Sequence, residues 1–546
     1  MFRLIRSIVV LSIAAIVLLA VMPAAPRQLP PAPAGFPPAV RGIVHIHTNR
    51  SDGTGSVDDV IGAAAAAGLN FIVVTDHGDG TRTPDLPDYR QGVLYIDAAE
   101  ISTYQGHVLA LGLPKAQYPL AGDARDVVDD IHRLGGMAIA AHPGSPKPEL
   151  QWTDWDVPID GLEWLNADSE WRDERAWVFA RALLTYPFRP AQSLALLLDR
   201  PDAVIRRWDE LARQRRVVGL AAADAHARVG VRSLGEPYDS AGSLHFPAYT
   251  SSFREFSISL PNVRLTGDAV GDAKLVLDAI RDGAFYSTID ALAGPAALRI
   301  SADAGKVRVD AQAPGDAQVT LFHDGGVVTK TTGAHVEYTA ENGTYRVEVA
   351  LPDSPGTPPV PWLMSNHVYV GIPPNRQSPA PARAVHTTAS VYAGGAARGW
   401  TIEKSQASDA AMQTIGALPG SQLLLRFALS GTATDSPYAA FVMPATPAIA
   451  TFERLLFNAR ADRPMRLSVQ LRSPGGEGER WRRSVYLDQT PRMVDLAFAD
   501  FRPVNAASAT PADLTKVDSV LFVVDTVNTK IGSNGQIQID DIKYAR

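Results

Sequence analysis

The sequence predicts a multidomain protein in which an α/β domain precedes all-β domains. Between Arg41 and Ala227, short apolar runs of strand length alternate with helical segments, a pattern typical of a largely parallel sheet. After Gly294, the chain changes to short strands separated by Gly, Asp and Asn turns, which favours a β-sandwich. The length of 546 residues suits three or four domains at about 150 residues each.

The N-terminus has the features of an export signal. Arg3 and Arg6 precede an apolar run over residues 7–22, whose length lies between that of a signal-peptide core and that of a membrane span. Both interpretations place the rest of the chain outside the cytoplasm, because the arginines stay inside. We therefore expect a signal peptide or N-terminal membrane anchor at 1–26, a Pro-rich linker at 27–40, and a periplasmic or extracellular protein.

The first folded domain is expected over residues 41–292, with its sheet open or closed into a barrel. Ser56 caps its first helix, and Gly68 follows the end of that helix. A second helix is expected at 123–134, and a helical insertion at 171–216. The expected strands lie within residues 42–48, 69–77, 92–100, 106–113, 135–143, 160–166 and 217–226.

Two all-β domains are expected after the first domain, a β-sandwich at 293–372 and a second domain at 386–546, joined by a linker at 373–385. The last domain ends in GSNGQIQIDDIKYA and resembles galactose-binding-like jelly rolls. Three aromatic residues of this domain either stack on sugars or, as we favour, pack in its core. They are Trp400, Trp481 and Tyr486.

The composition excludes several classes of chemistry. The chain has no Cys, so disulfides, thiolate zinc sites, iron–sulfur clusters and cysteine nucleophiles are ruled out, and any metal must be held by His, Asp or Glu. The formal net charge of −7 argues against a protein that coats nucleic acid. Neither a phosphate-binding Gly-rich loop nor a serine-hydrolase elbow is present in the sequence.

Metal-ligating residue types gather near the strand ends of the first domain. His45 and His47 share one face of the first strand, because side chains alternate along a strand, and Asp224 and His226 repeat this spacing after the seventh. In parallel-strand barrels the carboxyl ends of the strands converge on one face. The number of ligands is too large for one ion and suits two or three divalent ions. The predicted ligands are His45, His47, Asp52, His77, Glu100, His107, His142, Asp224 and His226.

In this order, the motifs HIHTNRSDG, TDH, E-x6-H, AAHP and DAH resemble those of the PHP (polymerase and histidinol phosphatase) superfamily. The resemblance spans about residues 41–255 and the helix and strand near 274–289. It implies a distorted (β/α)7 barrel with a trinuclear metal centre. The predicted fold is therefore a multidomain α/β plus all-β protein, with this barrel followed by a β-sandwich and a galactose-binding-like jelly roll.

The resemblance also implies how the ligands are shared among ions such as Zn, Mn or Fe. The ligands of the first ion would be His45, His47, Glu100 and Asp224. Those of the second would be Glu100, His107 and His142. Those of the third would be Asp52, His77 and His226, although some family members carry His at the position of Asp52.

The amidohydrolase superfamily shares the H-x-H motif of the first strand and is the nearest competing family. Many of its binuclear members bridge their metals with a carbamylated lysine on a mid-barrel strand. Here the lysines that precede His226 are Lys115 and Lys147, both in Pro-flanked loops. Neither is placed for that role, so the PHP resemblance is favoured.

Other residues near the centre have two interpretations each. Asp76, beside His77, is either a proton donor or, as we favour, a group that orients the ligands. Arg228 and Arg254 are equally interpreted as clamps for a substrate anion or as surface arginines. Two tryptophans in the loop after the fifth strand either wall the pocket or, as we favour, pack the insertion; they are Trp152 and Trp155.

These observations predict an exported metal-dependent hydrolase of a small-molecule ester, with a phosphomonoester or phosphodiester as the favoured substrate. A carbamate or carboxylic-ester hydrolase on the same centre stays open. A carbohydrate-binding surface protein with a scaffold barrel is the second class, and its contacts would come from the C-terminal domain. The intact set of nine ligands favours the enzyme, because a binding module has no use for them.

Overall fold

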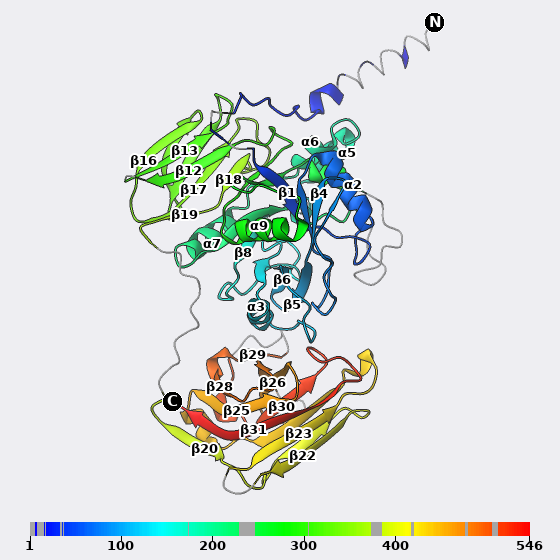
Figure 1. Ribbon diagram of the computed structural model, residues 1–546, viewed down its shortest axis with the longest axis vertical. Helices are drawn as coiled ribbons and strands as arrows, with labels where there is room; N and C mark the ends of the chain where they lie inside the picture. Colours follow the sequence, from blue (N-terminus) through cyan, green and yellow to red (C-terminus); the bar gives the residue numbers. More distant parts are fainter. Residues whose placement is uncertain are drawn as a thin grey trace. The chain divides into compact units, whose positions relative to one another are not determined.

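The computed structural model shows a chain that is mostly β-sheet with few helices (Figure 1). Two compact units make up the chain: unit 1 comprises Met1–Pro114 and Asp123–Ser378, and unit 2 comprises Lys115–Gly122 and Pro379–Arg546. The structure describes all residues except 1–5, 8–11, 13–15, 17, 33–34, 37, 173, 229–245, 304, 373–384, 417–419, 475–478 and 505–510.

The larger sheet of unit 1 is organised around β1 (Val40–Val44), which pairs in parallel with β2 (Phe71–Val74) and antiparallel with β10 (Ser257–Leu260). Its strand order is β15-β14-β17-β18-β11-β10-β1-β2-β4-β3, with β19 on β17. All residues of β2 and β4 (Val93–Asp97) are buried, as expected of apolar runs covered on both faces. The other strands are β3 (Asp88–Arg90), β11 (Tyr286–Thr288), β14 (Gln318–His323), β15 (Gly326–Thr332), β17 (Gly343–Ala350), β18 (Leu363–Ser365) and β19 (Val368–Val370).

A second sheet of unit 1 has the order β5-β6-β7-β8-β9, in which the last three strands are parallel. Isolated parallel bridges, Ile46 with Ala225 and His77 with Glu100, join it to the larger sheet. One hydrophobic core contains side chains of both sheets, so the two sheets face a shared interior. The strands are β5 (Ala99–Thr103), β6 (Gly106–Leu111), β7 (Met137–Ala140), β8 (Gly161–Asn166) and β9 (Val218–Ala222).

The helices of unit 1 begin and end where local chemistry specifies. Ser56 and Asp59 form a capping box at the start of α2 (Val57–Ala67), and Gly68 ends it at a positive φ of 73°. Asp123 caps α3 (Ala124–Arg133), which fills the range expected for the second helix. The remaining helices are α4 (Ala167–Glu170), α5 (Ala176–Thr185), α6 (Pro190–Ala195), α7 (Asp202–Ala212), α8 (Tyr249–Phe253) and α9 (Ala269–Arg281).

The predicted boundary between residues 292 and 293 does not separate two sheets. Backbone hydrogen bonds pair β11 with β18, so the larger sheet continues from the α/β region into the region expected to be a separate β-sandwich. The reason is that β11 would otherwise present an unpaired edge, which β18 covers. Only a three-stranded sheet stands apart, made of β12 (Leu298–Asp303), β13 (Lys306–Ala311) and β16 (His335–Thr339).

The segment expected to be a linker at 27–40 makes specific contacts. Arg27 forms a bridge with Ala293 and ion pairs of 2.8 Å with Asp316 and Asp353. The predicted signal or anchor lies partly outside the described residues. Among the residues that are described, no helix is long and apolar enough to cross a membrane.

Unit 2 is a β-sandwich of two sheets, with strand orders β22-β23-β31-β25-β28 and β21-β24-β30-β26-β27-β29, and with β20 on β31. One core cluster lies between the sheets. Trp481 is 3% exposed within it, and Trp400 stacks on Phe522 at 5.8 Å, so both tryptophans pack in the core. The predicted linker lies outside the described residues except for its last. The strands are β20 (Thr388–Tyr392), β21 (Thr401–Lys404), β22 (Asp409–Ile415), β23 (Gln422–Ala428), β24 (Tyr438–Pro444), β25 (Arg454–Ala461), β26 (Met465–Arg472), β27 (Arg480–Leu487), β28 (Arg492–Ala497), β29 (Arg502–Pro503), β30 (Ser519–Asp525) and β31 (Asn534–Ala545).

Candidate metal centre

The predicted ligands come from strand ends of both sheets of unit 1. His45 and His47 directly follow β1, and Asp224 and His226 directly follow β9. The middle residues of these two pairs form a parallel bridge, which places the pairs side by side. The i, i+2 spacing therefore does what the sequence predicts: it directs both side chains of each pair to one face.

Glu100 is the central carboxylate of the cluster and is 1% exposed. Its Oε2 lies 3.1 Å from Nε2 of both His45 and His47. Its Oε1 lies 2.7 Å from His107 Nδ1 and 3.0 Å from His142 Nε2. The two oxygens thus face different imidazoles, which is the arrangement required of a carboxylate shared between two ions.

Asp224 faces the same pair of histidines from the opposite sheet. Its Oδ1 lies 3.2 Å from His45 Nε2 and 3.3 Å from His47 Nε2. One donor atom from each of the three residues lies within 4.8 Å of the others. This group holds three of the four ligands that the family resemblance implies for the first ion.

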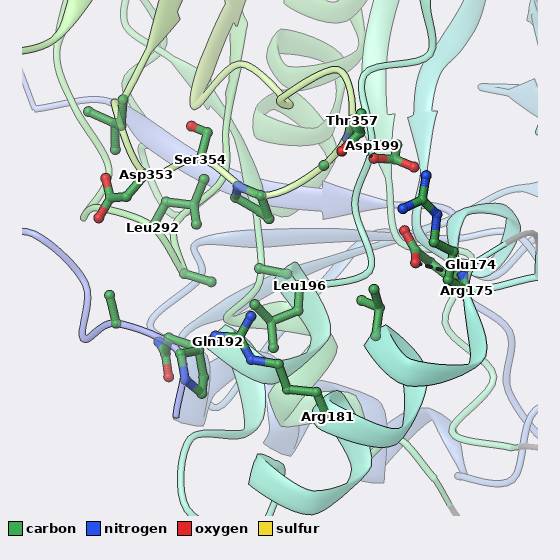
Figure 2. A pocket seen from close by; sticks show the side chains of 18 of the residues that line it. Glu174, Arg175, Arg181, Gln192, Leu196, Asp199, Leu292, Asp353, Ser354 and Thr357 are labelled. Atoms are coloured by element: carbon green, nitrogen blue, oxygen red, sulfur yellow. Dashed lines mark hydrogen bonds between the residues drawn. The ribbon is translucent and has the colours of Figure 1, made fainter. Parts of the chain in front are cut away.

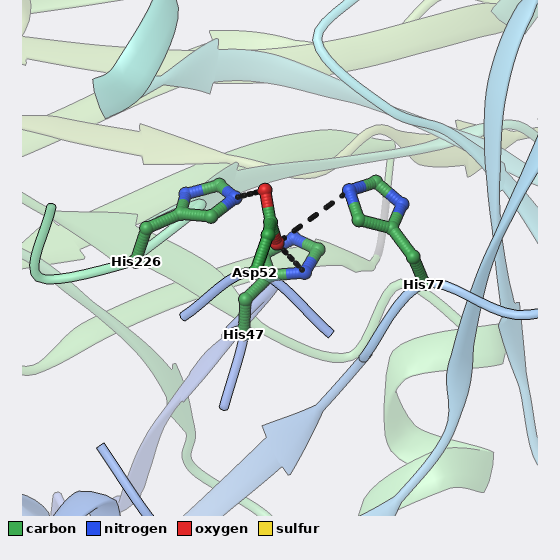
Figure 3. A group of neighbouring side chains, drawn as sticks. All are labelled: His47, Asp52, His77 and His226. Carbon is green, nitrogen blue, oxygen red and sulfur yellow. Dashed lines mark ion pairs between the residues drawn. The ribbon is translucent and has the colours of Figure 1, made fainter. Parts of the chain in front are cut away.

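Asp52 gathers a second group at the exposed side of the centre (Figure 3). Its Oδ2 lies 3.2 Å from His226 Nε2, and its Oδ1 lies 3.8 Å from His77 Nε2 and 3.5 Å from His47 Nδ1. The donor atoms of all four residues fall within 4.8 Å of one another. His47 thus stands between two groups, with Nδ1 toward Asp52 and Nε2 toward Glu100.

A third group of donor atoms within 4.8 Å consists of His77, Glu100 and His107. The family resemblance implies His142 rather than His77 beside these two residues. The structure places both there, since His77 Nδ1 is 3.4 Å from Glu100 Oε2 and His142 is in contact with Oε1. The nine side chains therefore form one cluster, and the division of its ligands among ions stays a prediction.

The electrostatics of the cluster favour positive charge. Burial lowers the pKa of His47, but its interactions with Asp224 and Glu100 outweigh burial and raise that pKa from 6.5 to about 10. Burial raises the pKa of Glu100, yet the neighbouring histidines hold it well below its usual value. His77 differs, because burial lowers its pKa to about 4. A bound divalent cation would stabilise the ionised carboxylates in the same way as the protonated histidines do.

Two buried polar atoms indicate that the donor set fits a metal. His47 Nε2 and Asp52 Oδ1 have no hydrogen-bond partner of acceptable geometry among the described residues, although both lie close to other ligand atoms. Buried polar groups without partners are costly and call for an explanation. Imidazole nitrogens and carboxylate oxygens that converge in this way are the ligands that Zn, Mn and Fe accept.

Three ligands hold unusual backbone conformations. His45, His142 and Asp224 have φ angles of 67°, 32° and 45°, in the left-handed region that non-glycine residues seldom adopt. Such a conformation costs about 1–2 kcal/mol per residue. Strained residues that cluster at one site point to a function that the surrounding fold maintains.

Glu163, on β8, supports the centre and was not among the predicted residues. Its Oε1 lies 2.6 Å from His45 Nδ1, and its Oε2 accepts hydrogen bonds of 2.7 Å from the His142 backbone and from Asn166 Nδ2. It therefore fixes the ring of one ligand and the backbone of another. The sequence signal for Glu163 is that it is the one charged residue of a buried strand, β8.

The three other predicted site residues have different positions. Asp76 accepts hydrogen bonds from Thr48 N and Thr48 Oγ1 at 2.7 Å and from Ser51 Oγ at 2.6 Å, so it orients the loop that carries Asp52. Arg228 donates to the Asp52 carbonyl at 3.1 Å and is half-buried beside the centre.

The contacts of Arg254 fit the interpretation of it as a surface arginine. It is exposed and donates to the Ala66 carbonyl at 2.5 Å, where it satisfies the C-terminal end of α2. Trp152 likewise walls no described pocket, because it is 2% exposed and packs in the interior.

A pocket opens beside Asp224 and His226. Arg228 and Glu255 are among its charged lining residues. Glu255 is 3% exposed, and burial, together with nearby Glu170, raises its pKa well above the usual value. The apolar and aromatic part of the lining comes mainly from the helical insertion and includes Trp171, Phe179, Leu194, Leu197, Leu198 and Phe246.

A larger cavity of about 520 Å³ lies elsewhere in unit 1, between α5, α6, the segment 23–25 and the loop 351–357 (Figure 2). Arg181, Gln192 and Asp353 are among its lining residues. None of the nine predicted ligands lines it. Two pockets adjoin the centre and are candidate substrate sites: the pocket beside His226, of about 60 Å³, and a pocket of about 310 Å³ whose lining includes His77, Asp76, Arg50 and Arg82.

Comparisons with known proteins leave the family open. No family model matches the chain. An uncharacterized protein of Methanocaldococcus jannaschii, MJ1587, is 29% identical over 139 residues, which are 23% of this chain and 80% of that protein.

Among solved structures, the chain is similar to a family 11 carbohydrate-binding module of the Clostridium thermocellum cellulase Lic26A-Cel5E. The identity is 17%, the match covers 30% of this chain and 95% of that one, and the TM-score is 0.25. A family 30 carbohydrate-binding module matches at 9% identity, over 29% of this chain and 87% of its own, with a TM-score of 0.23. Likenesses at these TM-scores carry no argument about function.

Proposed function

We propose that the protein is a PHP-type metal-dependent hydrolase whose centre binds two or three divalent ions. One observation carries the proposal: nine imidazole and carboxylate side chains from separate strand ends converge, and three subsets of them hold their donor atoms within 4.8 Å. In this proposal, the two bridged sheets of unit 1 correspond to the distorted (β/α)7 barrel of that superfamily, with Zn, Mn or Fe as its ions.

The chain's own residues have distinct parts in the proposed reaction. When bound, clustered divalent ions supply Lewis acidity, which makes water nucleophilic near neutral pH and offsets charge on a phosphoryl group. Glu163 fixes the His45 ring so that its Nε2 points into the centre. Asp76 orients the loop that carries Asp52. Arg228, beside the centre, binds the substrate anion.

The substrate that this arrangement favours is a phosphomonoester or phosphodiester. Arg228 lines the pocket beside His226, and Arg50 and Arg82 line the pocket beside His77, so guanidinium groups next to the centre suit an ester with an anionic head. Hydrolysis of a carbamate or a carboxylic ester on the same centre is the alternative, because the ligand set does not distinguish these substrates.

The test is metal analysis of the purified full chain, combined with hydrolysis of p-nitrophenyl phosphate, bis-p-nitrophenyl phosphate and p-nitrophenyl acetate. We expect at least two divalent ions per chain and hydrolysis of a phosphate ester that stops on chelation. Fewer than two ions after reconstitution would overturn the multinuclear centre. Hydrolysis of the acetate alone would overturn the phosphoesterase and favour the alternative.

Carbohydrate binding by unit 2 is the second candidate function. The observation that favours it is the two-sheet β-sandwich itself. The tryptophans Trp400 and Trp481 do not serve it, because they pack in the core. Retardation of the full chain in gels that contain soluble β-glucan or agarose oligosaccharides would support this function, and unchanged mobility across such a panel would remove it.

We also propose that the protein is exported, on the basis of the two arginines and the apolar run at its N-terminus. Fractionation of expressing cells tests this, with the chain expected in the periplasmic, membrane or secreted fraction. Recovery in the cytoplasm alone would contradict it.

A further inference from the structure

Helix α5 and the turn after it expose an unusual amount of apolar surface. Trp177 is 62% exposed, Leu184 is 53% exposed, and Phe188 is 58% exposed. Leu183, at 44%, lies next to them. Large apolar side chains exposed singly are normal, but four within 12 residues form a patch that calls for a partner. We name these four residues the α5 face.

The helical period explains why this face is left outside. Trp177 and Leu184 are seven residues apart and so lie on one side of α5, and Phe188 lies in the turn that follows the helix. The opposite side is used for packing: Ala182 and Thr185 are buried, and Thr185 Oγ1 hydrogen-bonds to Ser193 of α6 at 2.8 Å. Helix α5 therefore packs against the protein with one side and exposes the apolar α5 face on the other.

The apolar N-terminal segment is tied to the same helix. Arg181 Nε donates to the Val21 carbonyl at 2.7 Å, and Arg189 Nη1 donates to the Pro23 carbonyl at 2.5 Å. Arg181 lies within the stretch that carries the α5 face, and Arg189 directly follows it. The apolar run 7–22 therefore ends beside this face, and its described residues Ile16 and Leu19 are 64% and 73% exposed.

The charge around the α5 face is mixed, because Arg175 and Arg181 line the same cavity as Glu174 and Asp199 (Figure 2). Residues 175–198 contain three arginines, Arg175, Arg181 and Arg189, and no acidic residue. Arg175 is exposed, whereas the other two are half-buried and hold the N-terminal segment. Exposed tryptophan and phenylalanine are typical of helices that lie in the headgroup region of a bilayer.

We propose that the α5 face lies against a lipid bilayer, beside the point at which the apolar N-terminal segment enters it. The chemistry recognised is a phospholipid surface, in which the apolar side chains enter the boundary between headgroups and acyl chains. A second copy of the chain and a protein partner are the other occupants, and the test distinguishes them. This inference does not depend on the proposed hydrolase.

The lack of native cysteine allows a direct test. Trp177→Cys and Phe188→Cys variants of the full chain are each labelled with the environment-sensitive dye NBD and reconstituted in vesicles of phosphatidylethanolamine and phosphatidylglycerol. A matched control is Val327→Cys, because Val327 is 58% exposed on β15, away from the α5 face. All three sites are exposed, so the substitutions leave the core intact; circular dichroism checks this.

We expect nitroxide-labelled acyl chains to quench the dye at positions 177 and 188 by about twofold, with a blue shift of emission, and to leave position 327 unchanged. Vesicle-bound protein with equal emission at all three sites would overturn the proposal. So would protein that fails to float with vesicles. A blue shift that appears without lipid and grows with protein concentration would instead show that a second copy covers the face.

Discussion

Among the described residues, unit 1 contains two buried clusters in which histidine side chains contact carboxylates. The two clusters differ in the cationic groups that accompany the carboxylates. In the first, Glu100 and Asp224 face imidazoles at 2.7 to 3.6 Å. In the second, Asp209 on α7 receives Arg346 Nε at 2.6 Å, Arg346 Nη2 at 2.8 Å and His367 Nε2 at 2.8 Å. The second cluster contains an arginine, which is always positively charged. In the first cluster, positive charge comes only from imidazoles that bind a proton or from a metal ion.

This difference in cationic groups indicates which of the two buried clusters has a structural role. In the second, Arg346 pairs with both Asp209 and Glu348, and Glu348 also pairs with Arg200 at 2.7 Å, so two cations balance two anions. The charges of this cluster therefore balance within the chain, although His367 Nδ1 has no hydrogen-bond partner among the described residues. The first leaves His47 Nε2 and Asp52 Oδ1 without hydrogen bonds among the described residues, as a site for an external cation would.

The strongest way to break this comparison is Glu100→Gln. The variant loses the carboxylate that faces both sets of imidazoles, so we expect at least one metal ion fewer per chain and about a 10³-fold lower rate of ester hydrolysis. Elemental analysis and steady-state kinetics measure both. Glu348→Gln, in the arginine cluster, is the control and should retain its metal; equal metal loss in both variants would contradict the distinction.

Arg346→Met tests the second cluster. It leaves Asp209 buried without its guanidinium partner, and we expect a loss of about 3–5 kcal/mol in the free energy of unfolding of unit 1. Urea unfolding followed by tryptophan fluorescence measures this. Arg207→Met is a matched control on α7, because Arg207 is half-exposed and its pair with Glu210 should contribute about 1 kcal/mol or less. Similar losses in the two variants would mean that burial of the pair is unimportant.

Glu163→Gln sharpens the comparison inside the first cluster, because Glu163 acts only through its hydrogen bonds to His45 and His142. We expect metal affinity to fall about 10–100-fold, and more in Glu163→Ala, since Gln can still accept a hydrogen bond from His45. Competition with a chelating dye measures the affinity. A fall in thermal stability with unchanged metal affinity would show that the residue has a purely structural role.

Acid should weaken the second cluster in a defined range. Burial raises the pKa of Asp209, but hydrogen bonds from Arg346 and His367 outweigh it and lower that pKa from 3.8 to about 2. A carboxylate with a lowered pKa stabilises the fold above its unfolded value, so roughly 2 kcal/mol should be lost as the pH falls from about 4 to 2. Unfolding midpoints across this range should fall less steeply in Asp209→Asn; parallel slopes would contradict the assignment.

Glu255 extends the comparison to a buried carboxyl whose pKa is raised by burial and by nearby Glu170. Because burial raises its pKa, the folded state holds a proton that the unfolded chain releases as the pH rises above 4.5, so Glu255 destabilises the fold at pH 8. Glu255→Gln should therefore raise stability by about 1 kcal/mol at pH 8 and change little at pH 4. Thermal melts at both values test this, and the same gain at both would reject it.

Local sequence predicts much of the candidate metal centre. The H-x-H and D-x-H pairs follow apolar strands, and side-chain alternation alone directs both members of each pair to one face. The caps at Ser56 and Gly68 likewise depend on neighbouring residues only. These features are predictable because the forces that specify them act within a few residues of the chain.

Only the tertiary structure decided features that join distant segments. Arg254 points to the end of α2 instead of the centre, and β18 completes the sheet beside β11, because each satisfies backbone groups far away in sequence. The pairing of Asp209 with Arg346 and the support of His45 by Glu163 have the same origin. Composition and spacing identify the predicted ligands, whereas the packing of distant segments determines their hydrogen-bond and ion-pair partners. The reason is that the free energy of burying a charge depends on the groups that the fold places beside it.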